Sequence, residues 1–302
     1  MKSKLTGLVA ATFTPLNADG EVDTDRVPAL VDHLEKNGVK GIYINGSTGE
    51  GTSLTCDERR EVASAYVSSA KGRLKTVVQV GSNSIKDSQA LAAHAESLGV
   101  DAISSTSPSY FKPTSTEVLI RTVAEIASGA PNTPFYYYHI PAMTGIDISM
   151  VDFLETVGDA IPTIAGIKFA STALSEQQQC MHVDDGRFEI LGADDAILMQ
   201  VKITGAEGFI GSTFNFMAPV YLRIIDAVDH NDLETARRWQ LKSLRAISAI
   251  LDTCGRAGLK ESMSFVGLDC GPSRLPIRSP GPKERESLRG KLDTMGFFEW
   301  IA

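Results

Sequence analysis

The hydrophobic pattern of this 302-residue chain alternates between short apolar runs and longer amphipathic stretches. The apolar runs are bounded by glycine, proline and polar residues, which is typical of buried strands. We therefore predict eight strands, over residues 8–13, 41–45, 76–80, 102–105, 134–139, 164–169, 188–191 and 208–211. The stretches between them repeat apolar positions with helical spacing, most clearly over residues 25–37, 57–70, 84–98, 116–128 and 194–203.

Strands that alternate with helices of this length indicate parallel βαβ units. Eight such units within about the first 215 residues match the size of a (β/α)8 barrel, so we expect an α/β fold of the TIM-barrel type. The alternative is an open, doubly wound sheet. That fold would be expected to carry a glycine-rich nucleotide loop after its first strand. The corresponding segment here reads TFTPLNADGEVD, which contains no such motif.

The chain continues beyond the eighth predicted strand with helical patterns rather than further strands. Residues 218–228 and 233–251 have helical spacing, a loop with four prolines follows, and residues 283–293 form a charged helical segment. We therefore predict two parts: a barrel over residues 1–230 that carries the active site, and a C-terminal helical extension over residues 231–302.

Composition and charge exclude several classes of protein. Hydrophobic residues make up 43% and charged residues 22% of the chain, as in soluble globular proteins. The formal net charge of −8 and the absence of a Lys/Arg cluster argue against nucleic acid as a partner. No apolar run is long enough to cross a membrane, and the N-terminal segment reaches Thr and Pro before a signal-peptide core develops. We expect a cytoplasmic protein.

Cysteine and histidine spacing gives no sign of a metal site. The four cysteines, Cys56, Cys180, Cys254 and Cys270, lack CxxC spacing, so we expect reduced thiols. The five histidines form no HxxH or HExxH pattern. We predict that the protein binds no metal.

Lys168, near the end of the apolar segment IAGIKFA, is the main candidate for covalent chemistry. Burial of an ammonium group is costly, so an apolar surrounding lowers the pKa of lysine and favours the neutral, nucleophilic amine. Such an amine can form a Schiff base with a carbonyl compound. The alternative is a lysine that extends its charge to solvent or pairs with a buried acid. In a barrel, Lys168 would lie at the C-terminal strand ends, where active sites form.

The segment GSTGEGTSLT follows the second predicted strand and contains Ser47 and Thr48 between glycines. Its backbone can turn sharply and present N–H groups together with two hydroxyl groups, which suits a carboxylate. The alternative is an ordinary glycine-rich turn in which Ser or Thr caps the next helix.

The fifth predicted strand ends in PFYYYHIP. Strand alternation divides its side chains between two faces: Tyr136, Tyr138 and Ile140 on one, and Phe135, Tyr137 and His139 on the other. A tyrosine at this strand end could lie beside Lys168 and transfer a proton to or from a substrate hydroxyl. The spacing leaves Tyr137 and Tyr138 both open, and aromatic filling of the core accounts for at least one of the three tyrosines.

Four segments in this order, GSTGEGTSLT, YHIPAMTG, GIKFA and GSTFN, resemble the pyruvate-dependent class I aldolases of the N-acetylneuraminate lyase and dihydrodipicolinate synthase family. The resemblance extends over residues 14–215. It implies a TIM barrel with C-terminal helices, commonly a homotetramer, that uses no cofactor and acts on pyruvate and an amino sugar or sugar acid.

The resemblance also implies roles for individual residues. Lys168 would form the Schiff base, and Tyr138 would transfer the proton. Ser47 and Thr48 would hold the pyruvoyl carboxylate, with Ser47 also joining the proton relay. Tyr110 lies where the family places a tyrosine that completes the relay in a neighbouring subunit.

Two segments bear on the substrate. Synthases of this family carry an arginine where this chain has Met143, and that arginine binds the second carboxylate of aspartate semialdehyde. The lyases bind sugar hydroxyls through the segment that reads GADD here, which gives Gly192, Asp194 and Asp195, together with Ser212, as expected substrate contacts. The resemblance therefore implies reversible cleavage of N-acetylneuraminate to N-acetylmannosamine and pyruvate.

The chain departs from the lyase pattern at two positions. Asp195 replaces the usual glutamate and is one methylene shorter, and Ala170 replaces a residue that often carries a hydroxyl. Three alternatives remain: the same imine chemistry on a 2-keto-3-deoxy sugar acid or aspartate semialdehyde, a phosphorylated-sugar enzyme, and an inactive barrel that binds a sugar acid. The two adjacent aspartates would repel a phosphate dianion, which disfavours the second of these.

Overall fold

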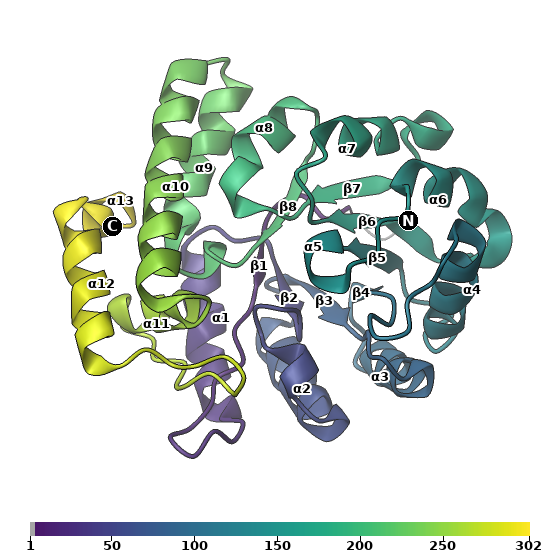
Figure 1. The fold of residues 1–302 in the computed structure, drawn as a ribbon, viewed down its shortest axis with the longest axis horizontal. Coiled ribbons are helices and arrows are strands. Elements are labelled where there is room, and N and C mark those ends of the chain that lie inside the picture. The colour runs from purple at the N-terminus through teal and green to yellow at the C-terminus, as the bar shows by residue number, and fades with distance from the viewer. Residues whose placement is uncertain (1–3) are drawn as a thin grey trace.

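The computed structural model describes residues 4–302, and its centre is a closed barrel of parallel strands (Figure 1). The strands follow one another around the barrel in chain order, and Gly7–Ala10 pair with Gly208–Gly211 to close it. This closure confirms the predicted TIM-barrel fold and excludes the open sheet. The strands are β1 (Gly7–Ala11), β2 (Gly41–Ile44), β3 (Lys75–Gln79), β4 (Ala102–Ser105), β5 (Phe135–His139), β6 (Ile164–Phe169), β7 (Glu189–Gly192) and β8 (Gly208–Gly211).

Successive side chains of each strand alternate between the barrel interior and the surrounding helices. The interior cluster contains Val9, Tyr43, Val77, Ala102, Tyr136, Tyr138, Leu191 and Ile210. Outward side chains such as Ile42, Ile44, Phe135 and Tyr137 belong to a separate cluster with the helices. The predicted division of the β5 side chains between two faces is therefore confirmed.

The helices that surround the barrel begin at well-formed caps. The hydroxyls of Thr55, Ser84, Ser115 and Ser149 each accept a hydrogen bond from a backbone N–H in the first turn of the helix that follows. The five helices predicted between the strands are present, whereas α5, α6 and α7 were not predicted. This layer comprises α1 (Val27–Lys36), α2 (Cys56–Ala70), α3 (Ile85–Ser97), α4 (Thr116–Ala127), α5 (Pro141–Thr144), α6 (Met150–Val157), α7 (Leu174–Cys180) and α8 (Leu198–Ile203).

Helices α9 to α13 follow the last strand. The long helix α10 lies along α9, and α12 packs on the outer side of α10 (Figure 1). A division of the chain at residue 230 stays a prediction. The elements are α9 (Phe214–Asp229), α10 (Leu233–Cys254), α11 (Ala257–Phe265), α12 (Pro282–Thr294) and α13 (Phe297–Trp300).

Two of these helices differ from the predicted elements. Helix α9 begins at Phe214 rather than at residue 218, with non-helical backbone angles at Met217 shortly before Pro219. Helix α11 was not predicted, because its buried face contains the polar residues Lys260 and Ser262, which hide the apolar period. Within residues 4–302, no helix combines the length and apolar character needed to cross a bilayer.

Candidate active site

Lys168 occupies the interior of the barrel near the C-terminal end of β6. In the strand register its Cα pairs with Tyr138 of β5 on one side and with Leu191 of β7 on the other. Lys168 is 4% exposed, which excludes the alternative in which its charge extends to solvent. Burial lowers the pKa of Lys168 well below its usual value. Burial therefore favours the neutral, nucleophilic form of the amine.

Two tyrosine rings enclose the amine of Lys168. Its Nζ atom lies 3.6 Å from the ring centroid of Tyr138 and 3.8 Å from that of Tyr43. The two rings meet edge to face, with centroids 5.8 Å apart. Tyr137 faces outward instead and packs against Phe153. The geometry thus brings Tyr138, and not Tyr137, to the lysine.

Burial and three neighbours, Ser47, Arg256 and Asp195, act on the pKa of the Tyr138 phenol. Burial and the negative charge of Asp195 raise this pKa, whereas a hydrogen bond with the Ser47 side chain and the positive charge of Arg256 lower it. Both of the lowering interactions stabilise the phenolate. Tyr138 and Ser47 are therefore connected, as a proton relay requires.

The turn that contains Ser47 and Thr48 lies directly after β2, beside the end of β8. The Thr48 and Ser212 hydroxyl oxygens are 2.6 Å apart. The hydroxyl of Thr14 donates to the carbonyl oxygen of Gly49 at 2.7 Å and fixes the turn from β1. Thr55, at the end of the same GSTGEGTSLT segment, caps α2, so a threonine of this segment does cap the next helix, while Ser47 and Thr48 lie in the turn before it.

Asp195 lies just beyond β7, and its carboxylate is held in place by the residues after β8. Its Oδ2 atom accepts hydrogen bonds from the backbone N–H of Thr213 at 2.7 Å and from the Thr213 hydroxyl at 2.6 Å. A Cβ atom added at Gly211 would lie 2.4 Å from Asp195 Oδ1, so glycine is needed there. Burial raises the pKa of Asp195 to about 6, although the Thr213 hydrogen bonds act in the opposite direction.

The remaining residues of the GADD segment lie at the same rim. Gly192 ends β7 and pairs with Phe209 of β8. Asp194 accepts a hydrogen bond from the backbone N–H of Ala196 through Oδ1. Both aspartates therefore already accept hydrogen bonds from the protein, which leaves only part of each carboxylate for a substrate.

Tyr110 is not brought to Lys168 within the same chain. It lies in the loop after β4, where its backbone N–H donates to the side-chain oxygen of Asn83. Its side chain is 80% exposed and stacks edge to face against Phe111, which is 85% exposed. Met143 of α5 is exposed as well.

Sequence reasoning missed three residues of this site. Tyr43 could have been found from alternation along β2, which points it into the barrel. Thr213 lies two residues after the end of β8, but its contact with Asp195 depends on how the two loops meet. Arg256 precedes α11, and its positive charge lowers the pKa of both Lys168 and Tyr138. No local sequence signal marks Arg256.

Among residues 4–302, no group of three or more His, Cys, Asp or Glu side chains is arranged to hold a metal ion. All four cysteines are free thiols, as predicted.

Comparison with known proteins places the chain in a family. The model of the dihydrodipicolinate synthetase family matches residues 4–295. An N-acetylneuraminate lyase of Danio rerio is 41% identical over 96% of both chains, and one of Pongo abelii is 39% identical over 99% of this chain and 95% of its own. The solved structure of the Proteus mirabilis N-acetylneuraminate lyase superposes with a TM-score of 0.95 at 34% identity, covering 98% of this chain and all of that one. The chain therefore belongs to the dihydrodipicolinate synthetase family.

Proposed function

We propose that this protein is a class I aldolase that reversibly cleaves N-acetylneuraminate to N-acetylmannosamine and pyruvate. The observation that carries the proposal is the amine of Lys168, which is buried and enclosed by the rings of Tyr138 and Tyr43, with its pKa lowered by burial. The relatives named N-acetylneuraminate lyase support the choice of substrate.

The reaction begins when the neutral amine of Lys168 attacks the C2 ketone of the open-chain sugar acid. Tyr138 donates its phenol proton to the carbinolamine hydroxyl, which leaves as water; this gives an iminium ion with Lys168 as its nitrogen and leaves Tyr138 as the phenolate. The carboxylate next to C2 binds at the turn after β2, where Ser47 and Thr48 offer hydroxyl groups and backbone N–H groups. This arrangement fixes C2 close to the amine.

The iminium ion then accepts the electron pair of the C3–C4 bond as that bond breaks. Tyr138, as the phenolate, takes the proton of the C4 hydroxyl, and N-acetylmannosamine leaves as the aldehyde. The remaining enamine takes the proton back at C3, and one water molecule hydrolyses the imine to pyruvate and free Lys168. The Ser47 hydrogen bond and the Arg256 charge favour this role, since both stabilise the phenolate.

The rest of the sugar extends toward the ends of β7 and β8. Asp194, Asp195 and Ser212 offer hydrogen-bond acceptors to its hydroxyl groups, and Gly192 belongs to the same rim at the end of β7. The same aspartates disfavour a substrate with a second negative charge. Met143 stands where an arginine would be needed to bind aspartate semialdehyde.

The proposal includes a homotetramer in the cytoplasm. The exposed pair of Tyr110 and Phe111 suits burial against a second subunit, because two large aromatic rings at 80% and 85% exposure leave much apolar surface in water. In such an assembly Tyr110 would complete the proton relay of the neighbouring active site.

Borohydride reduction in the presence of pyruvate, followed by mass spectrometry, tests the chemistry. We expect a stable adduct at Lys168, and none in the Lys168→Ala variant. The absence of an adduct in the wild-type protein would exclude the Schiff-base mechanism and favour a barrel that only binds a sugar acid.

Retro-aldol rates test the substrate. We expect a higher kcat/KM for N-acetylneuraminate than for 2-keto-3-deoxygluconate, measured by the release of pyruvate. The reverse preference would keep the imine chemistry and reject the proposed substrate.

A further inference from the structure

The turn that carries Ser47 and Thr48 has an unfavourable backbone conformation at both ends. Asn45 has φ 60° and Glu50 has φ 55°, which places two non-glycine residues in the left-handed region. Each such residue costs on the order of 1 kcal/mol. A turn with this geometry persists only where surrounding groups fix it. At the Glu50 end, the side-chain contacts of Glu50 supply this restraint.

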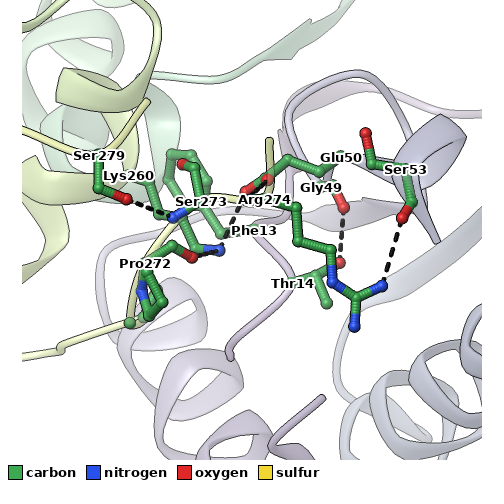
Figure 2. A network of polar contacts seen from close by, with 12 residues as sticks. Phe13, Thr14, Gly49, Glu50, Ser53, Lys260, Pro272, Ser273, Arg274 and Ser279 are labelled. Carbon is green, nitrogen blue, oxygen red and sulfur yellow. Dashed lines mark hydrogen bonds and ion pairs between the residues drawn. The ribbon is translucent and has the colours of Figure 1, made fainter. Parts of the chain in front are cut away.

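Both carboxylate oxygens of Glu50 bind the C-terminal part of the chain (Figure 2). Oε1 accepts a hydrogen bond from Lys260 Nζ of α11 at 3.0 Å, and Oε2 accepts one from the backbone N–H of Arg274 at 2.7 Å. Lys260 also donates to the carbonyl oxygen of Pro272 at 2.7 Å. Glu50 and Lys260 are 6% and 4% exposed, so this is a buried, fully paired contact.

Arg274 extends the contact to a second point of the same loop (Figure 2). Its guanidinium donates to the carbonyl oxygens of Ser53 and Gly20 and to the carboxylate of Glu58. Glu58 in turn forms the capping box of α2 with Thr55. The C-terminal segment therefore binds the loop after β2 at Glu50 and at Ser53.

This contact lies next to the proposed carboxylate site. Thr48, Glu50 and Lys260 line one small cavity of about 10 Å³, which is space for about one water molecule. Thr48 is also the residue whose hydroxyl meets Ser212. A shift of Glu50 would consequently move the groups that are to receive the substrate carboxylate.

We propose that Glu50, Lys260 and Arg274 are positioning residues, through which the C-terminal helices hold the Ser47–Gly49 turn in its carboxylate-binding conformation. The inference rests on the proposed function, since it assigns a role in binding the pyruvoyl carboxylate. None of the three residues forms a bond with the substrate in the reaction. Their loss should weaken pyruvate binding more than it slows the later steps.

The Glu50→Gln variant tests this proposal. It keeps the size of the side chain but removes the charge and one of the two acceptor oxygens. We expect the pyruvate concentration that gives half-maximal borohydride trapping at Lys168 to rise about tenfold, because a small displacement of a binding group has a large effect. The maximal yield of the adduct should change little.

A matched pair of variants separates positioning from general stability. Glu50→Gln leaves Lys260 as a buried, unpaired charge, whereas Glu50→Gln combined with Lys260→Met removes both charges and should recover part of the lost Tm. Half-saturation by pyruvate should stay raised in the double variant. Glu261→Gln is the control, because Glu261 also belongs to α11 but pairs with Arg285 of α12. Its half-saturation should equal that of the wild type.

The possible outcomes are distinct. The positioning role is rejected if the pyruvate concentration for half-maximal trapping in Glu50→Gln stays within twofold of the wild type. It is also rejected if this concentration and Tm both return to the wild-type values in the double variant. The double variant supplies this answer even where Glu50→Gln alone does not fold. If the wild-type protein forms no adduct with pyruvate, the proposed function fails, and this inference fails with it.

Discussion

Two opposite charges act on the pKa of Lys168 in addition to burial, and their effects can be separated. Burial is the largest influence and lowers the pKa of Lys168; Asp195 raises this pKa, and Arg256 lowers it. The two charges come from different parts of the chain, Asp195 from the end of β7 and Arg256 from the N-terminus of α11. The reactivity of one amine is therefore adjusted by both the barrel and the C-terminal helices.

Substitution of these two charges should shift the pH profile of imine formation in opposite directions. The amine must be neutral to attack, so the rate falls as the pH drops through the pKa of Lys168. Arg256→Gln removes a cation and raises this pKa, so the acid limb moves to higher pH. Asp195→Asn removes an anion and moves the limb to lower pH. The initial rate of adduct formation with pyruvate measures both, and Arg238→Gln on the exposed side of α10 is the control. Shifts in the same direction would contradict this electrostatic account.

Tyr138→Phe removes the proposed proton acceptor and leaves the aromatic ring beside Lys168. We expect kcat for sugar-acid cleavage to fall by about 10²–10⁴-fold, the usual contribution of general acid–base catalysis. Trapping of the pyruvate adduct should persist, because Lys168 remains. Tyr137→Phe is the matched control, since Tyr137 packs outward against Phe153, and its kcat should be close to that of the wild type. Equal losses in both variants would reject the assignment to Tyr138.

Among the secondary-structure elements, the sequence predicted the strands and helices whose apolar residues recur at regular spacing. The strand positions were predicted to within about a residue or two at their ends, because each strand is a short apolar run, and alternation placed Tyr138 and Tyr137 on opposite faces of β5. The choice between these tyrosines required the register with β6, which the sequence does not contain. The influence of Arg256 on Lys168 and Tyr138 could not be predicted, since the position of Arg256 depends on the path of α11 over the barrel.

Helix α12 offers a test of helix propensity without any change of packing. Gly290 is exposed in its interior, and a methyl group added there would meet no atom within 4 Å. Gly290→Ala should therefore stabilise the protein by about 0.5–1 kcal/mol, visible as a rise in Tm of roughly 2 °C. The same change at Gly211 should lower Tm, because the methyl group would collide with the Asp195 carboxylate. A fall in Tm for Gly290→Ala would contradict this view of α12.

At the scale of the molecule, distant parts of the chain are joined by a few polar contacts. The guanidinium of Arg274 connects the tail of the chain to Glu58 at the start of α2. Mainly through this hydrogen bond, the pKa of Glu58 is lowered from 4.5 to about 2. Since the folded protein binds this proton less readily than the unfolded chain, the contact makes stability depend on pH.

The pH dependence follows from the sign of this shift. The stabilisation by Glu58 is fully present above pH 4.5, the value for the unfolded chain, and is lost as the pH falls toward 2. The Tm advantage of the wild type over Glu58→Gln should therefore be largest near neutral pH and shrink in acid. Glu286→Gln, at an exposed site on α12, serves as the control, with a difference in Tm that stays constant. A wild-type advantage that grows in acid would contradict the assignment.

The contact between Glu50 and Lys260 joins residues 210 positions apart, and this has a consequence for the protein during its synthesis. Every proposed catalytic and substrate-binding residue, from Ser47 to Ser212, leaves the ribosome before Lys260 does. At roughly 5–20 residues per second, the 48 positions from 212 to 260 take about 2–10 s to translate. For that interval the nascent chain carries its reactive lysine without the tail that anchors the turn after β2. A chain terminated early in this window would contain the whole proposed catalytic set and still bind pyruvate poorly.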